Sequence, residues 1–191
     1  MRKRFIVSTI ITLAFLFTAG CSRKAELSQQ EKSLLLTVED LARYDKGKHD
    51  PSRGRFVKEI DPQDQSVSLV YEYESQKGTD EPPLYISCTL DIDPKSSDTT
   101  FIKSAIDIGF WAGFKSQCVK EVPINNYPSY GKRSKFSLLT MDEKPIGNLF
   151  VVEYDRKVIT ILISGICIDK ASIWQEIADK KINLIQKYEV P

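Results

Sequence analysis

The chain has a single histidine, His49, and this scarcity limits the chemistry that it can perform. Hydrolysis by a side-chain nucleophile needs a base beside it, and histidine is the usual base. His49 lies between Lys48 and Asp50 in a polar stretch, which is typical of a solvated surface residue. No metal-ligand spacing joins it to the cysteines. We therefore expect neither a histidine-dependent active site nor a metal centre.

A phosphate loop and an excess of basic charge are also missing. Gly109 and Gly113 lie in a helical pattern, and Gly47 and Gly54 lie in a polar stretch, so neither pair has the strand-to-helix setting of a phosphate loop. Residues 21–191 carry 24 basic side chains against 26 acidic ones. Nucleic-acid binding draws on a basic excess that releases counterions. We expect no cofactor and no nucleic-acid partner.

The chain also lacks an apolar run long enough to span a bilayer at its start. Arg2, Lys3 and Arg4 precede an apolar run over residues 5–17, and small residues follow it at Ala19 and Gly20. A transmembrane helix needs about 20 apolar residues. This three-part order is typical of a secretory signal peptide that is removed. The sequence predicts a leader over residues 1–20.

The end of this leader resembles a bacterial lipobox. Thr18-Ala19-Gly20-Cys21 matches that motif at its last three positions and departs from it at Thr18, where the family usually has leucine. The resemblance implies that Cys21 receives a diacylglycerol through a thioether and becomes the new N-terminus. The same resemblance implies sorting to the outer membrane, facing the periplasm, if the host is Gram-negative, because Ser22 rather than aspartate follows the cysteine. The alternative is an ordinary secreted protein in which Cys21 is an unmodified thiol.

Three further cysteines, Cys88, Cys118 and Cys167, make an odd number for a compartment where disulfides form. Cys88 and Cys167 lie in apolar strand patterns. Burial of both as small hydrophobic side chains is favoured over a bridge between them. The pairing of the three stays open.

The remaining chain has the size of one domain, with a polar tether at 21–27 and a single domain at 28–191. Ser28 and Glu31 have capping-box spacing, and an apolar stripe follows at Leu34, Leu35, Val38, Leu41 and Ala42. This pattern predicts one helix that ends before Gly47. Further helices are predicted over 99–115 and 172–188, the last opened by Asp169 or Ser172.

Alternating apolar residues predict strands over 67–73 and 84–92, and residues 56–60 form a weaker candidate. A long loop is predicted over 122–131, followed by three strands over 136–141, 149–154 and 158–166. The last is apolar on both faces, so it should be central in the sheet. The fold class is α+β, an antiparallel sheet of about five or six strands with amphipathic helices packed across it.

The meander over 136–166 and the helix over 172–188 resemble the end of PsbP-like domains, which also occur as bacterial lipoproteins. This resemblance would cover most of the mature chain. It depends on element order alone.

Two groups of residues are candidate binding sites. Tyr127, Tyr130, Lys132 and Arg133 combine aromatic rings and positive charge in one loop, a mixture suited to a carbohydrate, a lipid headgroup or a protein. The alternative is a loop held down by its own tyrosines. Trp111 and Phe114 could line an apolar pocket or contact a partner, and the alternative is that they are core residues.

The carboxylate pairs Glu72 with Glu74 and Asp91 with Asp93 lack the apolar surroundings that would raise a pKa, and we assign them to the solvated face of the sheet. The leading hypothesis is a non-catalytic, lipid-anchored envelope protein, attached to the membrane through Cys21, that binds another envelope protein. A carrier or sensor with a small apolar or lipid ligand between sheet and helix is the alternative. A carboxylate-dependent hydrolase comes third.

Overall fold

The structure is a computed structural model, and it describes residues 23–44, 49–75, 83–95 and 119–189. The predicted helix over 99–115 lies outside the described residues, as do Cys21, Trp111, Phe114 and Cys118. In the described part of the chain, no helix is both long enough and apolar enough to cross a membrane.

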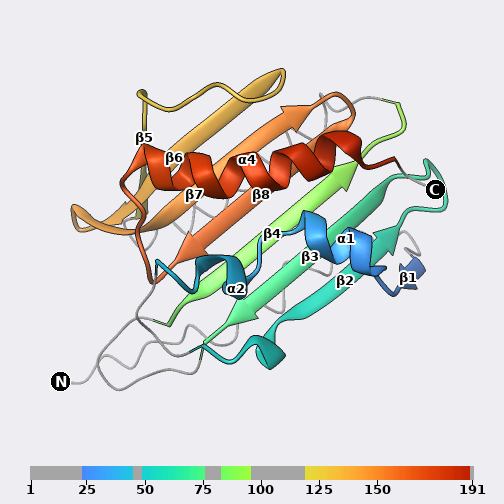
Figure 1. Ribbon diagram of the computed structural model, residues 1–191, viewed down its shortest axis with the longest axis horizontal. Coiled ribbons are helices and arrows are strands. Elements are labelled where there is room, and N and C mark those ends of the chain that lie inside the picture. The colour runs from blue at the N-terminus through green and yellow to red at the C-terminus, as the bar shows by residue number, and fades with distance from the viewer. Residues whose placement is uncertain (1–22, 45–48, 76–82, 96–118, 190–191) are drawn as a thin grey trace.

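An antiparallel sheet of eight strands forms the centre of the fold, in the order β1-β2-β3-β4-β8-β7-β6-β5 (Figure 1). Every neighbouring pair is antiparallel. The strands are β1 Arg23–Ala25, β2 Arg55–Ile60, β3 Val67–Glu74, β4 Tyr85–Ile92, β5 Val119–Pro123, β6 Arg133–Met141, β7 Lys144–Tyr154 and β8 Lys157–Ser164. Strand β8 lies between β4 and β7, which confirms its predicted central position.

Helices lie across one face of this sheet. They are α1 Gln29–Leu34, α2 Val38–Leu41 and α4 Ala171–Lys187, and a short 3-10 helix, η2, covers Pro51–Arg53. Figure 1 shows α1 and α2 over β3 and β4, with α4 running beside them over β7 and β8. The α+β class and the antiparallel sheet are therefore confirmed.

The predicted number of strands, five or six, is wrong, because the described residues alone form a sheet of eight. The two additional strands are its outer ones, β1 of three residues and β5 of five residues. All three residues of β1 are exposed, and no residue of β5 is buried. A strand without a buried face leaves no apolar alternation in the sequence. Strand β1 also includes part of the predicted tether, and β5 includes the start of the predicted 122–131 loop.

The single helix predicted after Ser28 is two short helices instead. The capping box of Ser28 and Glu31 is present at the start of α1. The chain then becomes extended at Leu35, with φ −87° and ψ 143°, and α2 begins after Thr37. Leu34, Leu35 and Leu36 are all buried. Three successive residues of a helix point in different directions, so a continuous helix that packs on the sheet by one face would not bury all three.

The main core lies between this link, α4 and the sheet. Tyr71, Cys88, Ile161, Phe150 and Phe136 lie in register across five strands, and all five are buried. Trp174 of α4 is fully buried, and its ring lies 5.0 Å from Phe136 and 5.8 Å from Phe150 between centroids. The strands predicted over 67–73 and 84–92 are confirmed as β3 and β4, and every second residue of each strand is buried in this core. A smaller apolar cluster of Leu139, Leu149, Val151 and Val158 is buried on the opposite face.

The predicted start of the last helix, at Asp169 or Ser172, is also wrong. Lys170 is the N-cap residue, without a side-chain capping bond. The path into the helix is fixed instead by buried Asn148, whose side chain accepts from the N–H of Ile168 at 2.7 Å and donates to its carbonyl at 3.0 Å. The Trp174 indole N–H donates to the same carbonyl at 3.2 Å. Tertiary hydrogen bonds therefore replace the local cap.

Candidate functional site

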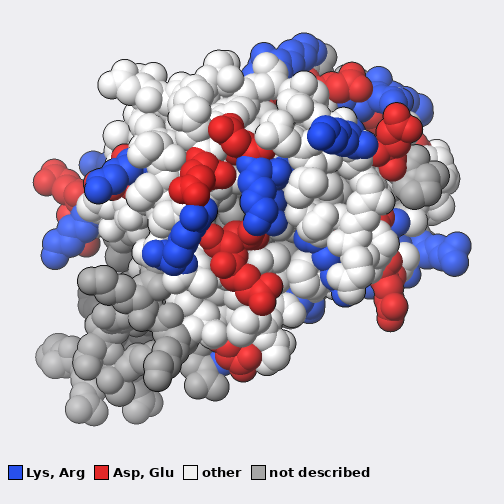
Figure 2. Space-filling view, viewed as in Figure 1, with Lys and Arg blue, Asp and Glu red and all other residues white. Residues whose placement is uncertain are grey.

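A groove of about 830 Å³ opens between α1 and α2 on one side and α4 on the other. We call it the charged groove, and its lining includes Lys32, Thr37, Asp40, Arg43, Phe56, Glu176, Lys180 and Lys181. Figure 2 shows basic and acidic side chains mixed over the middle of this face. The groove therefore presents both signs of charge close together.

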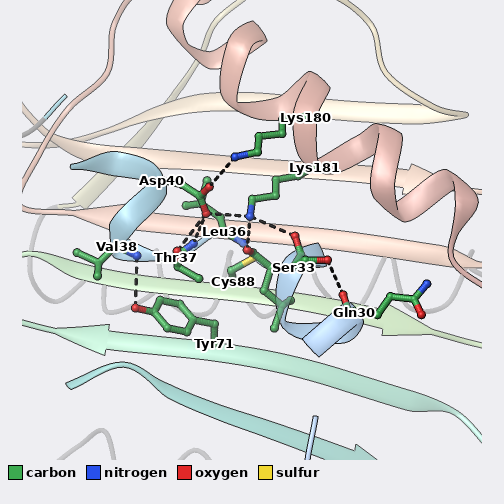
Figure 3. A network of polar contacts seen from close by, with 11 residues as sticks. Gln30, Ser33, Leu36, Thr37, Val38, Asp40, Tyr71, Cys88, Lys180 and Lys181 are labelled. Carbon is green, nitrogen blue, oxygen red and sulfur yellow. Dashed lines mark hydrogen bonds and ion pairs between the residues drawn. The ribbon is translucent and has the colours of Figure 1, made fainter. Parts of the chain in front are cut away.

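Lys181 and Asp40, whose side chains point toward each other in Figure 3, are largely buried lining residues that form the floor of the charged groove. The Lys181 side chain is 6% exposed, and its Nζ lies 2.8 Å from Oδ2 of Asp40. The same ammonium donates to the carbonyls of Ser33 at 3.2 Å and Leu35 at 2.7 Å. These carbonyls lie at the end of α1, where intrahelical donors run out. Lys181 thus joins α4 to the extended link between α1 and α2.

Asp40 is held as a carboxylate by the same contacts. Burial raises the pKa of Asp40, but hydrogen bonds from Lys181 and from the N–H of Thr37, at 2.9 Å, outweigh it and leave that pKa below its ordinary value. A general acid needs a raised pKa. The floor of the groove is thus a structural contact rather than a candidate acid catalyst.

The rim of the charged groove is exposed. Arg43 and Glu176 form an ion pair of 2.6 Å, and their side chains are 60% and 55% exposed. Lys180 is 70% exposed and lies 3.7 Å from Asp40. Exposed pairs of this kind are worth about 0–1 kcal/mol. The rim side chains can therefore exchange their present partners for those of another molecule at little cost.

Cys88 lies directly below the groove floor. Its Sγ accepts from the N–H of Leu36 at 3.2 Å, and the residue is fully buried. Burial raises the pKa of the Cys88 thiol to about 12. Because the thiolate is the reactive form, Cys88 is a core residue rather than a nucleophile. Cys88 and Cys167 are both free thiols, so no bridge joins them.

The two predicted loop tyrosines pack against the helix face of the sheet. The ring of Tyr127 lies 4.7 Å from Phe136 and 5.7 Å from Phe150 between centroids. The Tyr130 hydroxyl donates to Asp179 of α4 at 2.6 Å. Burial and this carboxylate raise the pKa of Tyr130 to about 12. These contacts match the alternative in which the loop is held by its own tyrosines.

The two predicted cations, Lys132 at the end of this loop and Arg133 at the start of β6, contact the opposite face of the sheet. Glu153 is fully buried, and it pairs with Arg133 and with Lys132, the latter at 3.5 Å. Glu153 follows Val152 of the main core on β7, so its side chain points to the opposite face of the sheet. The structure therefore does not gather the tyrosines and cations into one patch. Their role in binding a partner stays a prediction.

The remaining candidates form no second site in the part of the chain that is described. Glu72 pairs with Arg55, and Asp91 accepts from Ser68. The ring of His49 lies edge-on to Tyr73, 6.0 Å between centroids. Among the described residues, no cluster of three or more histidine, cysteine, aspartate or glutamate side chains could hold a metal ion.

The groove residues were missed from the sequence, although one signal was present. Lys181 occupies a position within the apolar stripe of the last helix, between Ala178 and Ile182. A lysine at such a position needs a buried partner, so it could have indicated an ion pair.

Comparison with known proteins does not assign this chain to a family. The chain matches no protein-family model, no curated protein and no solved structure.

Proposed function

We propose that this protein is a lipid-anchored, non-catalytic component of the cell envelope that binds another envelope protein. The observation that carries the proposal is the leader, in which a basic start, an apolar run and small residues lead directly to Cys21. Several acyl chains on one residue hold a soluble domain on a bilayer durably, because each buried methylene contributes about 0.8 kcal/mol. Ser22 favours the outer membrane of a Gram-negative host.

The polar groups at the described site support a binding role rather than catalysis. Asp40 and Lys181 are engaged with each other and with backbone groups. The Cys88 thiol is buried with a raised pKa. A catalytic group instead needs a pKa matched to its proton transfer and access to a substrate. Neither condition is met at the floor of the charged groove.

The charged groove is our candidate for the partner surface. Its rim combines exposed Arg43, Glu176 and Lys180, which suits a polar protein surface with charges of both signs. A carrier of an apolar ligand would instead need space between α4 and the sheet. Trp174, Phe136 and Phe150 fill the described part of that layer. This packing favours the partner-binding hypothesis over the carrier.

Crosslinking in intact cells tests the partner surface. We expect a photoreactive residue in place of Arg43 to give a discrete adduct with another envelope protein. The same residue in place of Lys120, an exposed position on β5, is the control and should not give that adduct. Adding Lys180→Glu should lower the adduct yield, because it reverses a rim charge without touching Lys181. Absence of the Arg43 adduct, or the same adduct from Lys120, would contradict the proposed surface.

A further inference from the structure

The sheet begins only two residues after the predicted anchor. Strand β1 pairs with β2 in the register Arg23 to Ile60, Lys24 to Glu59 and Ala25 to Lys58. It is the outer strand of the sheet, as Figure 1 shows. Residues 23–25 are therefore part of the sheet, and the sequence leaves one residue, Ser22, between them and Cys21.

Covalent geometry limits how far the anchor can lie from this edge. Consecutive Cα atoms are about 3.8 Å apart, so the Cα of Cys21 lies within about 7.6 Å of the Cα of Arg23. The headgroup layer of one leaflet is roughly 5–8 Å thick. If the acyl chains of Cys21 are in the hydrocarbon, Arg23 must lie at or next to the headgroups. A longer flexible tether would remove this limit.

We propose that the β1 edge of the sheet stands on the phospholipid headgroups of the membrane that holds the anchor. This inference rests on the proposed lipidation of Cys21. Arg23 and Lys24 are exposed on this strand, and their positive charges suit the phosphates of anionic lipids. Strands lie about 4.8 Å apart, so β5, at the other edge, is roughly 34 Å from β1. In the proposed orientation the sheet rises from the bilayer, and β5 is directed away from it.

This orientation restricts which molecules can reach the charged groove. The helices cover one face of the sheet (Figure 1), and the groove lies on that face, since residues of α1, α2 and α4 line it. When the sheet stands on one edge, both of its faces are directed sideways, along the membrane plane. The partner of the charged groove is then a protein that lies beside this one on the same membrane.

Paramagnetic broadening by a lipid label tests the orientation. The protein is purified from membranes with its native modification and placed in nanodiscs of phosphatidylcholine and phosphatidylglycerol, with and without a nitroxide on the lipid headgroup. We expect the amide signals of β1 and β2 to lose most of their intensity with the nitroxide. The signals of β5 and β6 should keep most of theirs. Equal losses at the two edges, or a larger loss at β5, would overturn the proposal.

A matched variant isolates the short connection as the cause. A flexible Gly-Ser linker of about ten residues between Ser22 and Arg23 spans roughly 17 Å on average and keeps the anchor. The preferential loss at β1 and β2 should then largely disappear. If it persists unchanged, the short connection does not set the orientation.

A second preparation separates this inference from the proposed function. Residues 21–191, with Cys118→Ser and Cys167→Ser, are coupled through Cys21 to a maleimide lipid in the same nanodiscs. Cys88 is buried and does not compete for the lipid. If the protein purified from membranes carries no lipid on Cys21, the proposed anchoring is contradicted. The chemically anchored protein then still tests the orientation. Preferential broadening of β1 and β2 would support the edge-on arrangement, and its absence would overturn that arrangement alone.

Discussion

Replacing Lys181 with methionine is expected to lower the free energy of unfolding by about 3 kcal/mol. The Lys181 ammonium is almost completely buried, and it is shared by the Asp40 carboxylate and the carbonyls of Ser33 and Leu35. Methionine has a similar size but no donor, so the carboxylate and both carbonyls lose a partner in a low-dielectric setting. The melting temperature should fall by roughly 6–12 °C for a domain of this size.

Lys180 provides the matched control for this experiment. It is the neighbouring residue on α4, and it approaches the same carboxylate, but its side chain is 70% exposed. Lys180→Met should therefore change the unfolding free energy by about 0–1 kcal/mol. Urea denaturation of the mature chain measures both variants. Equal losses in the two variants would mean that the buried contacts of Lys181 do not hold α4 against the α1–α2 link.

Acidification is expected to weaken a second buried contact, at Glu31. This side chain accepts from the N–H of Ser28 at 2.7 Å and from the hydroxyl of Tyr188 at 3.0 Å, and it pairs with Lys58. Burial raises the pKa of Glu31, but these hydrogen bonds, that from Lys58 first, outweigh it and leave the pKa below the ordinary value of 4.5. The contact joins α1, β2 and the end of α4.

The direction of the pH effect follows from this lowered pKa. The unfolded chain takes up the proton at a higher pH than the folded chain, so stability falls as the pH decreases. The contribution of Glu31 is complete above pH 4.5 and is lost as the pH falls through its folded pKa below that value. Asp40 contributes in the same direction below its ordinary value of 3.8. We expect unfolding at lower urea concentrations at pH 3 than at pH 7.

Glu31→Gln identifies the residue responsible. At pH 7 it should cost about 3 kcal/mol, because Lys58 loses its counter-charge where both side chains are largely buried. The difference in stability between pH 7 and pH 3 should also shrink. Glu176→Gln is the control, since the pKa of Glu176 is lowered too but its side chain is more than half exposed. A pH dependence that Glu31→Gln leaves unchanged would contradict the assignment.

Strands with a buried face could be predicted from the sequence, and the outer strands could not. In β3 the alternate residues Val67, Leu69, Tyr71 and Tyr73 must reach one core, so their spacing identifies both the strand and its inner face. In β1, Arg23, Lys24 and Ala25 are all exposed, and only backbone pairing with β2 makes this segment a strand. That pairing is a tertiary contact, which the local pattern does not record.

The helix break and the charged groove could not be predicted for a related reason. Apolar spacing alone allows residues 28–43 to form one helix. In the structure the N–H of Leu36 instead donates to Cys88, and Lys181 donates to the carbonyls of Ser33 and Leu35, which the helix break leaves without helical partners. Lys181 is about 150 residues away in sequence, so no local pattern records this contact. The groove exists only because α4 lies beside α1 and α2. By contrast, Tyr130 of the loop and Arg133 at the start of β6 are close in sequence, but their side chains contact opposite faces of the sheet.

We propose that Cys21 carries the lipid that holds this protein on a membrane. This proposal is tested most directly by the intact mass and N-terminal peptide of protein extracted from the membranes of its host. We expect a chain that lacks residues 1–20 and begins with Cys21 modified by diacylglycerol, and Cys21→Ala should lose both the modification and membrane retention. A chain that begins at Met1, or one with an unmodified Cys21, would contradict the account.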